Sequence, residues 1–186
     1  MQHYILNDLR HPVTLDQNAR ILELEGIVAR LERELDAACH SDVFGCLNRA
    51  GLLRTLERLD LTGLACVYWD LDDLKVYNDL YGKPGVNDRV KAAITARDID
   101  FVAGQVFSGD EFSAFPFEAD AEPFADRLLK ELHARGLSAT FAVFRPLPNE
   151  TAHEVLARGE RMIKAFKQIG KGRVYTTGVA RYQQGE

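Results

Sequence analysis

The stretch Ser108-Gly109-Asp110-Glu111-Phe112 places two adjacent carboxylates directly after a glycine. The residues on both sides of it, 101–107 and 112–115, are rich in aromatic and small apolar side chains. Two β-forming runs around a short turn that contains Gly predict a β-hairpin with acids at its tip. Gly and Asp are also common in turns that only face water. This stretch by itself therefore leaves two interpretations open, a solvated turn and a functional site.

A second acidic cluster, which begins at Asp70, favours the site. The preceding run, 64–69, is continuously apolar, and its length suits a buried central strand. Ligands gather outside the carboxyl ends of strands in open α/β sheets. If the hairpin lies beside this strand, Asp110 comes close to Asp70. Two converging carboxylates predict an oxygen-ligand site for Mg²⁺ (or Mn²⁺) bound to a phosphate chain, as in phosphoryl transfer.

The residues after Asp70 predict a helix over 70–81, with Asp72 as its cap and Gly82 as its end. Its first amides, at Asp73 and Leu74, lack partners within the helix and suit a phosphate group.

Three lysines are candidate phosphate ligands. Lys167 and Lys171 are four residues apart at the end of a predicted helix, so both are expected to point the same way. Lysines are also common at helix C-termini, where the helix dipole favours them. Lys75, one turn into the helix after Asp70, is a weaker candidate.

The remaining sequence alternates between helix and strand patterns. Pro84-Gly85 predicts a loop, and Asn87 or Asp88 is expected to cap the helix that follows it. The order of elements favours an α/β (α+β) fold of the ferredoxin-like or palm type, with a mixed central sheet flanked by helices. The expected helices span 48–59, 87–96, 124–135 and 151–169, and the expected later strands span 137–144 and 174–177.

The N-terminal part predicts one long helix. Thr14 and Gln17 form a candidate capping box. The pattern favours a two-stranded parallel coiled coil and hence a homodimer, with a helix packed on its own domain as the alternative. The expected organisation is a short segment 1–13, a coiled-coil helix 14–39, a domain 40–180 and a tail 181–186. The apolar seam comprises Ile21, Leu24, Val28, Leu31, Leu35 and Ala38.

Composition excludes several classes of function. The net charge of −5 does not support a nucleic-acid surface, because phosphate binding needs a basic excess. No apolar run approaches the ~18 residues of a membrane span, and residues 1–5 lack the features of a signal peptide. Three cysteines, an odd number without ligand-like spacing, suit reduced thiols in a cytoplasmic protein, with Cys66 in the core.

Four ordered landmarks resemble the GGDEF-domain diguanylate cyclases, from about residue 40 to about residue 178. Residues 108–112 resemble the motif that names the family, with Ser for its first Gly. Residues 70–82 resemble its D-x-D-x-F-K-x-x-N-D-x-x-G stretch, with Leu for Phe. Residues 43–49 are similar to an L-T-G-L-x-N-R opening, and 167–171 to A-K-x-x-G-R near the domain end, with Phe166 in place of Ala.

The resemblance implies an Mg²⁺-dependent enzyme that joins two GTP molecules into cyclic di-GMP, with one GTP on each of two facing domains. A coiled-coil dimer would raise the effective concentration of the facing domains. The implied metal ligands are Asp70, the Leu71 carbonyl and Asp110. The implied catalytic residues are Asp70, Asp110 and Glu111. The implied nucleotide-binding residues are Asp73, Leu74, Lys75, Asn78, Asn87, Asp88, Gly109, Lys167 and Lys171.

Two departures from the family pattern bear on function. Asn87 stands where the family has an Asp that reads guanine. An alignment shifted by one residue would use Asp88 instead. Asn offers one acceptor and one donor, whereas Asp accepts two hydrogen bonds from guanine, so Asn87 weakens the preference for guanine. The family's inhibitory product site, R-x-x-D, is absent at the usual spacing, and Arg97 with Asp100 match it two residues too early. The alternatives are a cyclase with altered purine choice and a non-catalytic domain that binds GTP, cyclic dinucleotide or a protein partner.

Overall fold

The computed structural model describes residues 15–41, 43–96, 101–107 and 109–178. The chain divides into two compact units, 1–38 and 39–186. The first unit is built on helix α1 (Leu15–Cys39). The large apolar residues of its predicted seam are exposed along the helix, between 40% for Leu35 and 52% for Leu31. Thr14, the first residue of the expected capping box, lies outside the described residues.

The second unit contains a five-stranded mixed sheet in the order β2-β3-β1-β4-β5. The central strand β1 is antiparallel to both β3 and β4, and β4 is parallel to the edge strand β5. Strands β2 and β3 form the predicted hairpin. The expected mixed sheet flanked by helices is therefore confirmed. The strands are β1 (Cys66–Leu71), β2 (Ala103–Gln105), β3 (Glu111–Ala114), β4 (Ala139–Phe144) and β5 (Val174–Thr177).

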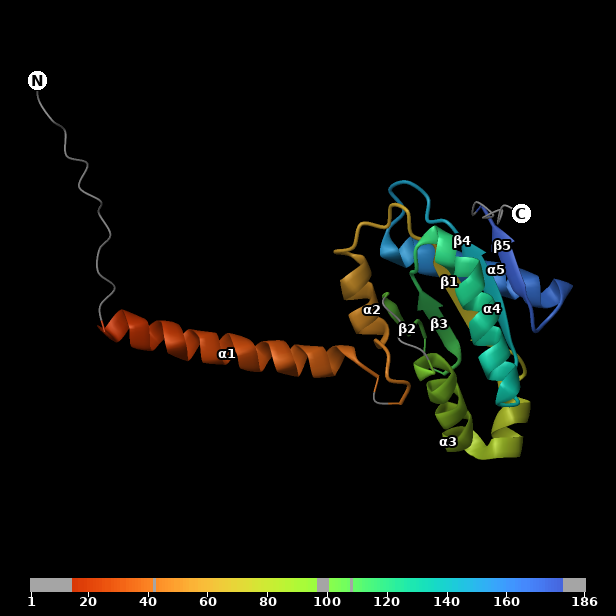
Figure 1. The fold of residues 1–186 in the computed structure, drawn as a ribbon, viewed down its shortest axis with the longest axis horizontal. Coiled ribbons are helices and arrows are strands. Elements are labelled where there is room, and N and C mark those ends of the chain that lie inside the picture. Colours follow the sequence, from red (N-terminus) through yellow and green to blue (C-terminus); the bar gives the residue numbers. More distant parts are fainter. Residues whose placement is uncertain (1–14, 42, 97–100, 108, 179–186) are drawn as a thin grey trace, which may run out of the picture. The chain divides into compact units, whose positions relative to one another are not determined.

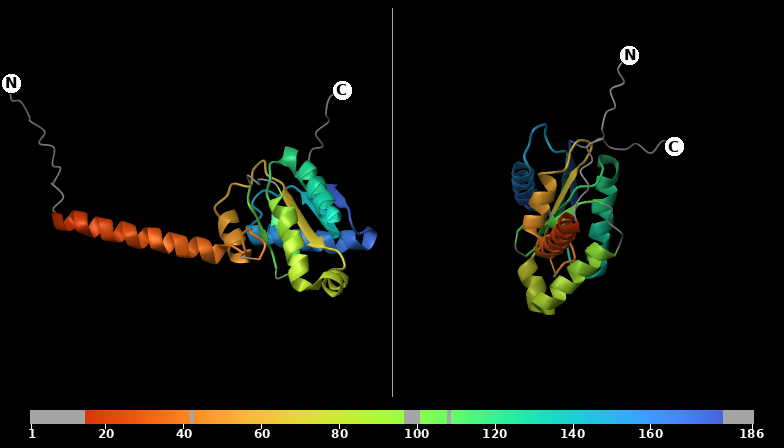
Figure 2. Two further views of the ribbon diagram at one scale, coloured as in Figure 1. Left: turned by 60° about the horizontal axis from the view of Figure 1, so that its bottom comes forward. Right: turned by 90° about the vertical axis from the view of Figure 1, so that its left-hand side faces the viewer.

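Helices cover both faces of the sheet, with α3 and α4 on one face and α2 and α5 on the other (Figure 1). The right-hand view of Figure 2 shows the strands between α4 and α5. Successive side chains of a strand point to opposite faces. Trp69 therefore enters the α3/α4 core and Tyr68 the α2/α5 core. The helices are α2 (Arg49–Leu56), α3 (Leu74–Thr95), α4 (Glu118–Ala134) and α5 (Ala152–Ile169).

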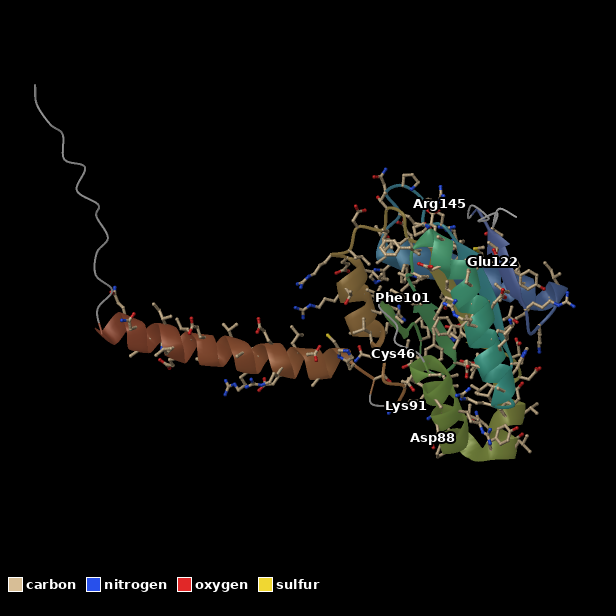
Figure 3. All side chains as sticks on the ribbon, in the orientation of Figure 1. Cys46, Asp88, Lys91, Phe101, Glu122 and Arg145 are labelled. Carbon is tan, nitrogen blue, oxygen red and sulfur yellow. The ribbon has the colours of Figure 1, made fainter. Side chains whose placement is uncertain are left out.

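The predicted break after Tyr81 is much shorter than expected. Gly82 has non-helical dihedrals (φ 70°, ψ 153°), and the chain returns to helix at once, with Pro84 near the start of the second half of α3. Proline suits a first turn because its missing N–H would have no partner there. The expected loop at Pro84-Gly85 is therefore wrong. Asn87 and Asp88 lie inside α3 rather than capping a helix, and Asp88 is exposed on it (Figure 3).

Helix α4 begins at Glu118, six residues before the predicted start at Phe124. The acids Glu118 and Asp120 lie in its first turn, where the helix dipole favours them. Ala121 is fully buried and continues the apolar face toward the start of the helix. Small residues such as Ala give a weak periodic signal, which is why the sequence placed the start too late.

Helix α5 approaches β1 closely at Gly159. A Cβ atom at this position would lie 2.4 Å from Tyr68 Cδ2 and 2.7 Å from Tyr68 Cγ. Both residues are buried, so the ring cannot move away into solvent. This close contact sets the height of α5 above the sheet, and the helix then ends near the carboxyl end of β1.

We expect Gly159→Ala to destabilise the domain. Overpacking a filled core costs about 1–3 kcal/mol, and the higher helix propensity of Ala offsets up to about 1 kcal/mol of that. The net loss of about 1–2 kcal/mol should lower the Tm by several degrees in a thermal melt. The matched control is Gly26→Ala on α1, where a Cβ meets nothing within 4 Å. An unchanged Tm for Gly159→Ala would contradict the close packing of α5 on β1.

Candidate active site

The predicted acidic residues meet at the carboxyl end of β1. Asp70 stands opposite Glu111 of β3 on one side and Thr140 of β4 on the other. The Leu71 amide donates a hydrogen bond to the Asp110 carbonyl, at 3.3 Å. The hairpin therefore brings both of its acids beside Asp70, with Asp110 in the turn and Glu111 as the first residue of β3.

The ammonium of Lys167 lies against this end of β1. Its Nζ is 2.9 Å from Asp70 Oδ2, donates to the Leu71 carbonyl at 2.7 Å and lies 3.6 Å from Asp72 Oδ1. The side chains of Lys167 and Asp70 are each only 18% exposed. A cation thus contacts two of the groups that the resemblance assigns to the metal.

Lys171 occupies a different position from the one predicted. Helix α5 ends at Ile169 and Gly170 follows as its cap, so Lys171 lies in the loop before β5 and not on the helical face of Lys167. Its Nζ contacts Asp73 Oδ1 at 2.6 Å, and its side chain is 47% exposed. The two lysines therefore reach the same corner by different routes and contact different carboxylates.

Asp72 does not cap α3, contrary to the prediction. Its carboxylate is 2% exposed and accepts hydrogen bonds from Ser138 Oγ at 2.9 Å, Thr140 Oγ1 at 2.8 Å and the Gly172 amide at 2.8 Å. Asp73 takes the cap position with a left-handed backbone (φ 52°, ψ 38°), and its side chain makes no capping bond. The first turn of α3 therefore has no side-chain cap to compete with a phosphate for its amides.

Burial governs the charge state of these acids. It raises the pKa of Asp70 to about 7, with a further increase from Asp110 and Glu111, while the Lys167 ammonium acts in the opposite direction. Burial also raises the pKa of Glu111, together with the charges of Glu160 and Asp110. The acidic corner is thus an unfavourable place for negative charge unless a cation is present.

The sequence did not indicate three residues that surround Glu111. Tyr68 and Lys164 lower the pKa of the Glu111 carboxyl, and Glu160 raises it. Glu160 and Lys164 also form an ion pair with each other on α5. Such a pair at a spacing of four is typical of any exposed helix, so its place beside the hairpin could not be recognised from the pattern.

The candidate base-reading residues lie along α3. Asn78 is on its first half, and its Oδ1 is buried without a hydrogen-bond partner in the described part of the chain. Asn87 is half-buried beyond the kink, whereas Asp88 and Lys75 are exposed. Gly109, in the turn before Asp110, has a φ of 115° and open space around it. Ser108, Arg97 and Asp100 lie outside the described residues.

A second cationic group lies at the start of the hairpin. The guanidinium of Arg49 stacks over the Phe107 ring, 4.3 Å from its centroid. Both residues line an open cavity of about 510 Å³ together with Asn48, Ala50 and Gln105. Arg49 ends the stretch 43–49 that resembles the family's opening motif, but that pattern assigned it no role at the hairpin.

The donor set at the end of β1 fits a hard divalent cation. Within residues 15–41, 43–96, 101–107 and 109–178, no group of three or more His, Cys, Asp and Glu side chains is placed to hold a metal. The candidate set is instead two carboxylates and the Leu71 carbonyl, all oxygen donors of the kind that Mg²⁺ prefers. Asp70 Oδ1 is buried and has no hydrogen-bond partner among the described residues, and Oδ2 already binds an ammonium.

Comparisons with known proteins identify the fold. A diguanylate cyclase, SiaD of Pseudomonas aeruginosa, solved with its activator SiaC, is 19% identical with a TM-score of 0.64, over 88% of this chain and 73% of that one. The chain has the GGDEF-domain fold. The coiled coil and GGDEF domain of DgcB from Caulobacter crescentus, solved with c-di-GMP, is 21% identical with a TM-score of 0.59, over 86% of this chain and 98% of that one.

A GGDEF domain from Vibrio cholerae whose motif is GGEEF, described as active, also matches, at 16% identity and a TM-score of 0.56, over 75% of this chain and 99% of that one. No family model matches the sequence, and no curated protein matches it. The similarity to GGDEF domains therefore lies in the fold.

Among the described residues, no helix has the length and apolar character needed to cross a membrane.

We expect Asp70→Asn and Asp72→Asn to change stability in opposite directions. The raised pKa of Asp70 means that the folded state keeps its proton to a higher pH than the unfolded chain, whose Asp titrates near 3.8. Its ionisation therefore reduces stability as the pH rises from about 4 to about 7. Asp70→Asn should raise the Tm at pH 8 in EDTA by about 2–4 °C, equivalent to about 1 kcal/mol, and change it little at pH 4.

Asp72→Asn removes one acceptor from a buried, fully bonded carboxylate. This change should lower stability by about 1–3 kcal/mol at pH 8, the cost of leaving a buried polar group unsatisfied. Thermal melts of both variants at the two pH values provide the measurement. A loss of stability for Asp70→Asn equal to that for Asp72→Asn would show that Asp70 is also a structural residue.

Proposed function

We propose that this protein is a diguanylate cyclase-type enzyme, a member of the GGDEF family that condenses two GTP molecules to cyclic di-GMP and pyrophosphate. One observation carries the proposal. In a chain with the GGDEF-domain fold, Asp70, the Leu71 carbonyl and Asp110 come together at the end of β1, beside the half-buried ammonium of Lys167. Carboxylates with a nearby cation at the carboxyl end of a strand suit the binding of a metal–phosphate complex.

The residues that would hold Mg²⁺ (or Mn²⁺) are Asp70, the Leu71 carbonyl and Asp110. Bound there, the ion would acidify the attacking 3′-hydroxyl and neutralise charge on the leaving pyrophosphate. Glu111 stands opposite Asp70 in the sheet register, which supports its carboxylate as the candidate to accept the hydroxyl proton.

The phosphate chain would lie at the start of α3. The amides of Asp73 and Leu74 begin this helix, where the dipole favours an anion, and no side chain caps them. Lys171 already reaches Asp73 from the loop before β5, so its ammonium can bind the same phosphates. Lys75, exposed in the first turn of α3, offers a further cation on that side.

The purine would be read from α3. The buried Asn78 Oδ1 lacks a hydrogen-bond partner in the described part of the chain, so it is a ready acceptor for a base N–H. Asn87 offers one acceptor and one donor where an Asp would accept two hydrogen bonds from guanine. We therefore propose GTP as the first substrate to test, with other purine nucleotides as competitors.

The two half-sites would meet in a homodimer held by α1. Five large apolar side chains, spaced at threes and fours from Ile21 to Leu35, are between 40% and 52% exposed on this helix. Exposed apolar residues in a single stripe favour pairing with a second helix. A parallel coiled coil would place two catalytic domains at the same end and raise their effective concentration.

The direct test is to incubate the full chain with Mg²⁺ and GTP, and with each other nucleoside triphosphate, and to separate the products by chromatography. We expect cyclic di-GMP and pyrophosphate from GTP. No cyclic dinucleotide from any triphosphate, at a protein concentration that maintains a dimer, would contradict the enzyme. Retained binding of GTP in that case would favour the non-catalytic domain.

Asp110→Asn should reduce cyclisation by about a hundredfold or more, the scale typical of losing one group that stabilises charge in the transition state. The matched control is Asp126→Asn, which changes an exposed carboxylate on α4 and should leave the rate unchanged. Initial rates of pyrophosphate release provide the measurement. An Asp110→Asn variant with the rate of the unmodified chain would remove Asp110 from the proposed metal ligands.

Leu31→Glu should convert the dimer to a monomer, because it places a charge in the centre of the apolar seam. The matched control is Leu22→Glu, which changes a 69% exposed leucine outside the seam and should leave the dimer intact. Light scattering coupled to size-exclusion chromatography measures both masses. Equal masses for the two variants would contradict the coiled coil.

A further inference from the structure

The position of Lys167 raises a question that the proposed function leaves open. Its ammonium donates to the Leu71 carbonyl at 2.7 Å and lies 2.9 Å from Asp70 Oδ2. The Asp70 carboxylate and the Leu71 carbonyl are also two of the three proposed metal ligands. One lysine therefore contacts two of the groups that a metal would need.

An ammonium and a divalent cation cannot share this pair of oxygens comfortably. Magnesium lies about 2.0–2.1 Å from its oxygen ligands and accepts little distortion. An ammonium held by the same two oxygens would then be close to the metal, in a half-buried place where like charges repel strongly. Repulsion between the two cations therefore favours departure of the lysine when a metal binds.

Release of Lys167 from the acidic corner is favoured by a replacement cation or a proton. Asp70 is 18% exposed, and its Oδ1 is buried with no hydrogen-bond partner in the described part of the chain. Asp110 and Glu111 both make its charge less favourable. The other nearby cation on α5, Lys164, is paired with Glu160. Loss of the Lys167 ammonium alone would leave a buried carboxylate that must either take up a proton or bear the cost of an uncompensated charge.

We propose that Lys167 is an internal counter-ion that closes the metal site of the free protein and is drawn away by the phosphates of the incoming nucleotide. This inference rests on the metal and nucleotide sites of the proposed function. Lys167 is the third residue from the end of α5, and its long, flexible stem lets the ammonium turn from Asp70 toward a phosphate at the start of α3. Metal and nucleotide then bind cooperatively, because each favours the state in which Lys167 has left Asp70.

The test is the affinity of the full chain for Mn²⁺ alone, without nucleotide, measured by electron paramagnetic resonance of the free ion. We expect Lys167→Gln to bind Mn²⁺ at least tenfold more tightly than the unmodified chain. Lys167→Ser, which leaves room for water beside Asp70, is the second neutral variant and should behave in the same way. Circular dichroism establishes that each variant is folded.

Two matched controls distinguish the effect of the Lys167–Asp70 contact from the effect of removing one positive charge near the site. Lys164→Gln and Lys171→Gln each remove one positive charge from the same corner, but neither lysine has an ion pair with Asp70. Both should bind Mn²⁺ within about threefold of the unmodified chain. If all the lysine variants bound Mn²⁺ more tightly by the same factor, net charge alone would explain the change. That result would refute the role of Lys167 as a counter-ion.

The remaining outcomes distinguish this inference from the proposed function. If the folded Lys167 variants bind Mn²⁺ no more tightly than the unmodified chain, and Asp70→Asn abolishes that binding, the metal site stands and the counter-ion is refuted. If neither the unmodified chain nor any Lys167 variant binds Mn²⁺ at millimolar concentration, the metal site itself is refuted and the counter-ion with it.

Discussion

The buried carboxylate of Asp72 holds the corner of the domain on which the acidic site depends. It accepts hydrogen bonds from Ser138, Thr140 and the Gly172 amide. It thereby joins the end of β1 to the start of β4 and to the loop between α5 and β5. Bonds to an ionised acceptor are about twice as strong as neutral ones, and burial makes their loss expensive. This network fixes the chain on both sides of Asp72, namely the candidate ligands before it and the first turn of α3 after it.

The distances along the chain explain which parts of this corner could be predicted. The apolar run 64–69, the Gly-containing hairpin turn and the helical pattern of 151–169 are local, and they predicted a strand, a hairpin and a helix that the structure contains. The partners of Asp72 are 66 to 100 residues away. No local spacing reveals them, so a helix cap was the simplest interpretation of Asp72. Lys171 was misplaced for a related reason, because the helical period was counted across Gly170, where the helix ends.

The same limit applies to the contacts of the candidate site. The sequence predicted that Asp70 and Asp110 converge, because strand pairing brings the ends of neighbouring strands together. It could not predict which oxygen atoms Lys167 contacts, since a lysine with four methylene groups can reach a phosphate, a carbonyl or a carboxylate from one backbone position. The sequence assigned Lys167 to the phosphates, whereas its contacts in the structure are Asp70 and the Leu71 carbonyl.

A site of this composition faces an internal conflict, and one lysine can resolve it. The start of α3 favours an anion, while Asp70, Asp110 and Glu111 beside it repel one. If this corner holds a phosphate chain, as proposed, a cation must accompany it, and a cation also helps the buried acids to stay ionised. Lys167 supplies a cation to Asp70 in the structure. In the proposed mechanism, a metal would take that place and the Lys167 ammonium would turn to the phosphates. On the proposed function, the unfavourable ionisation of Asp70 is the cost of keeping a buried carboxylate available for a metal ion.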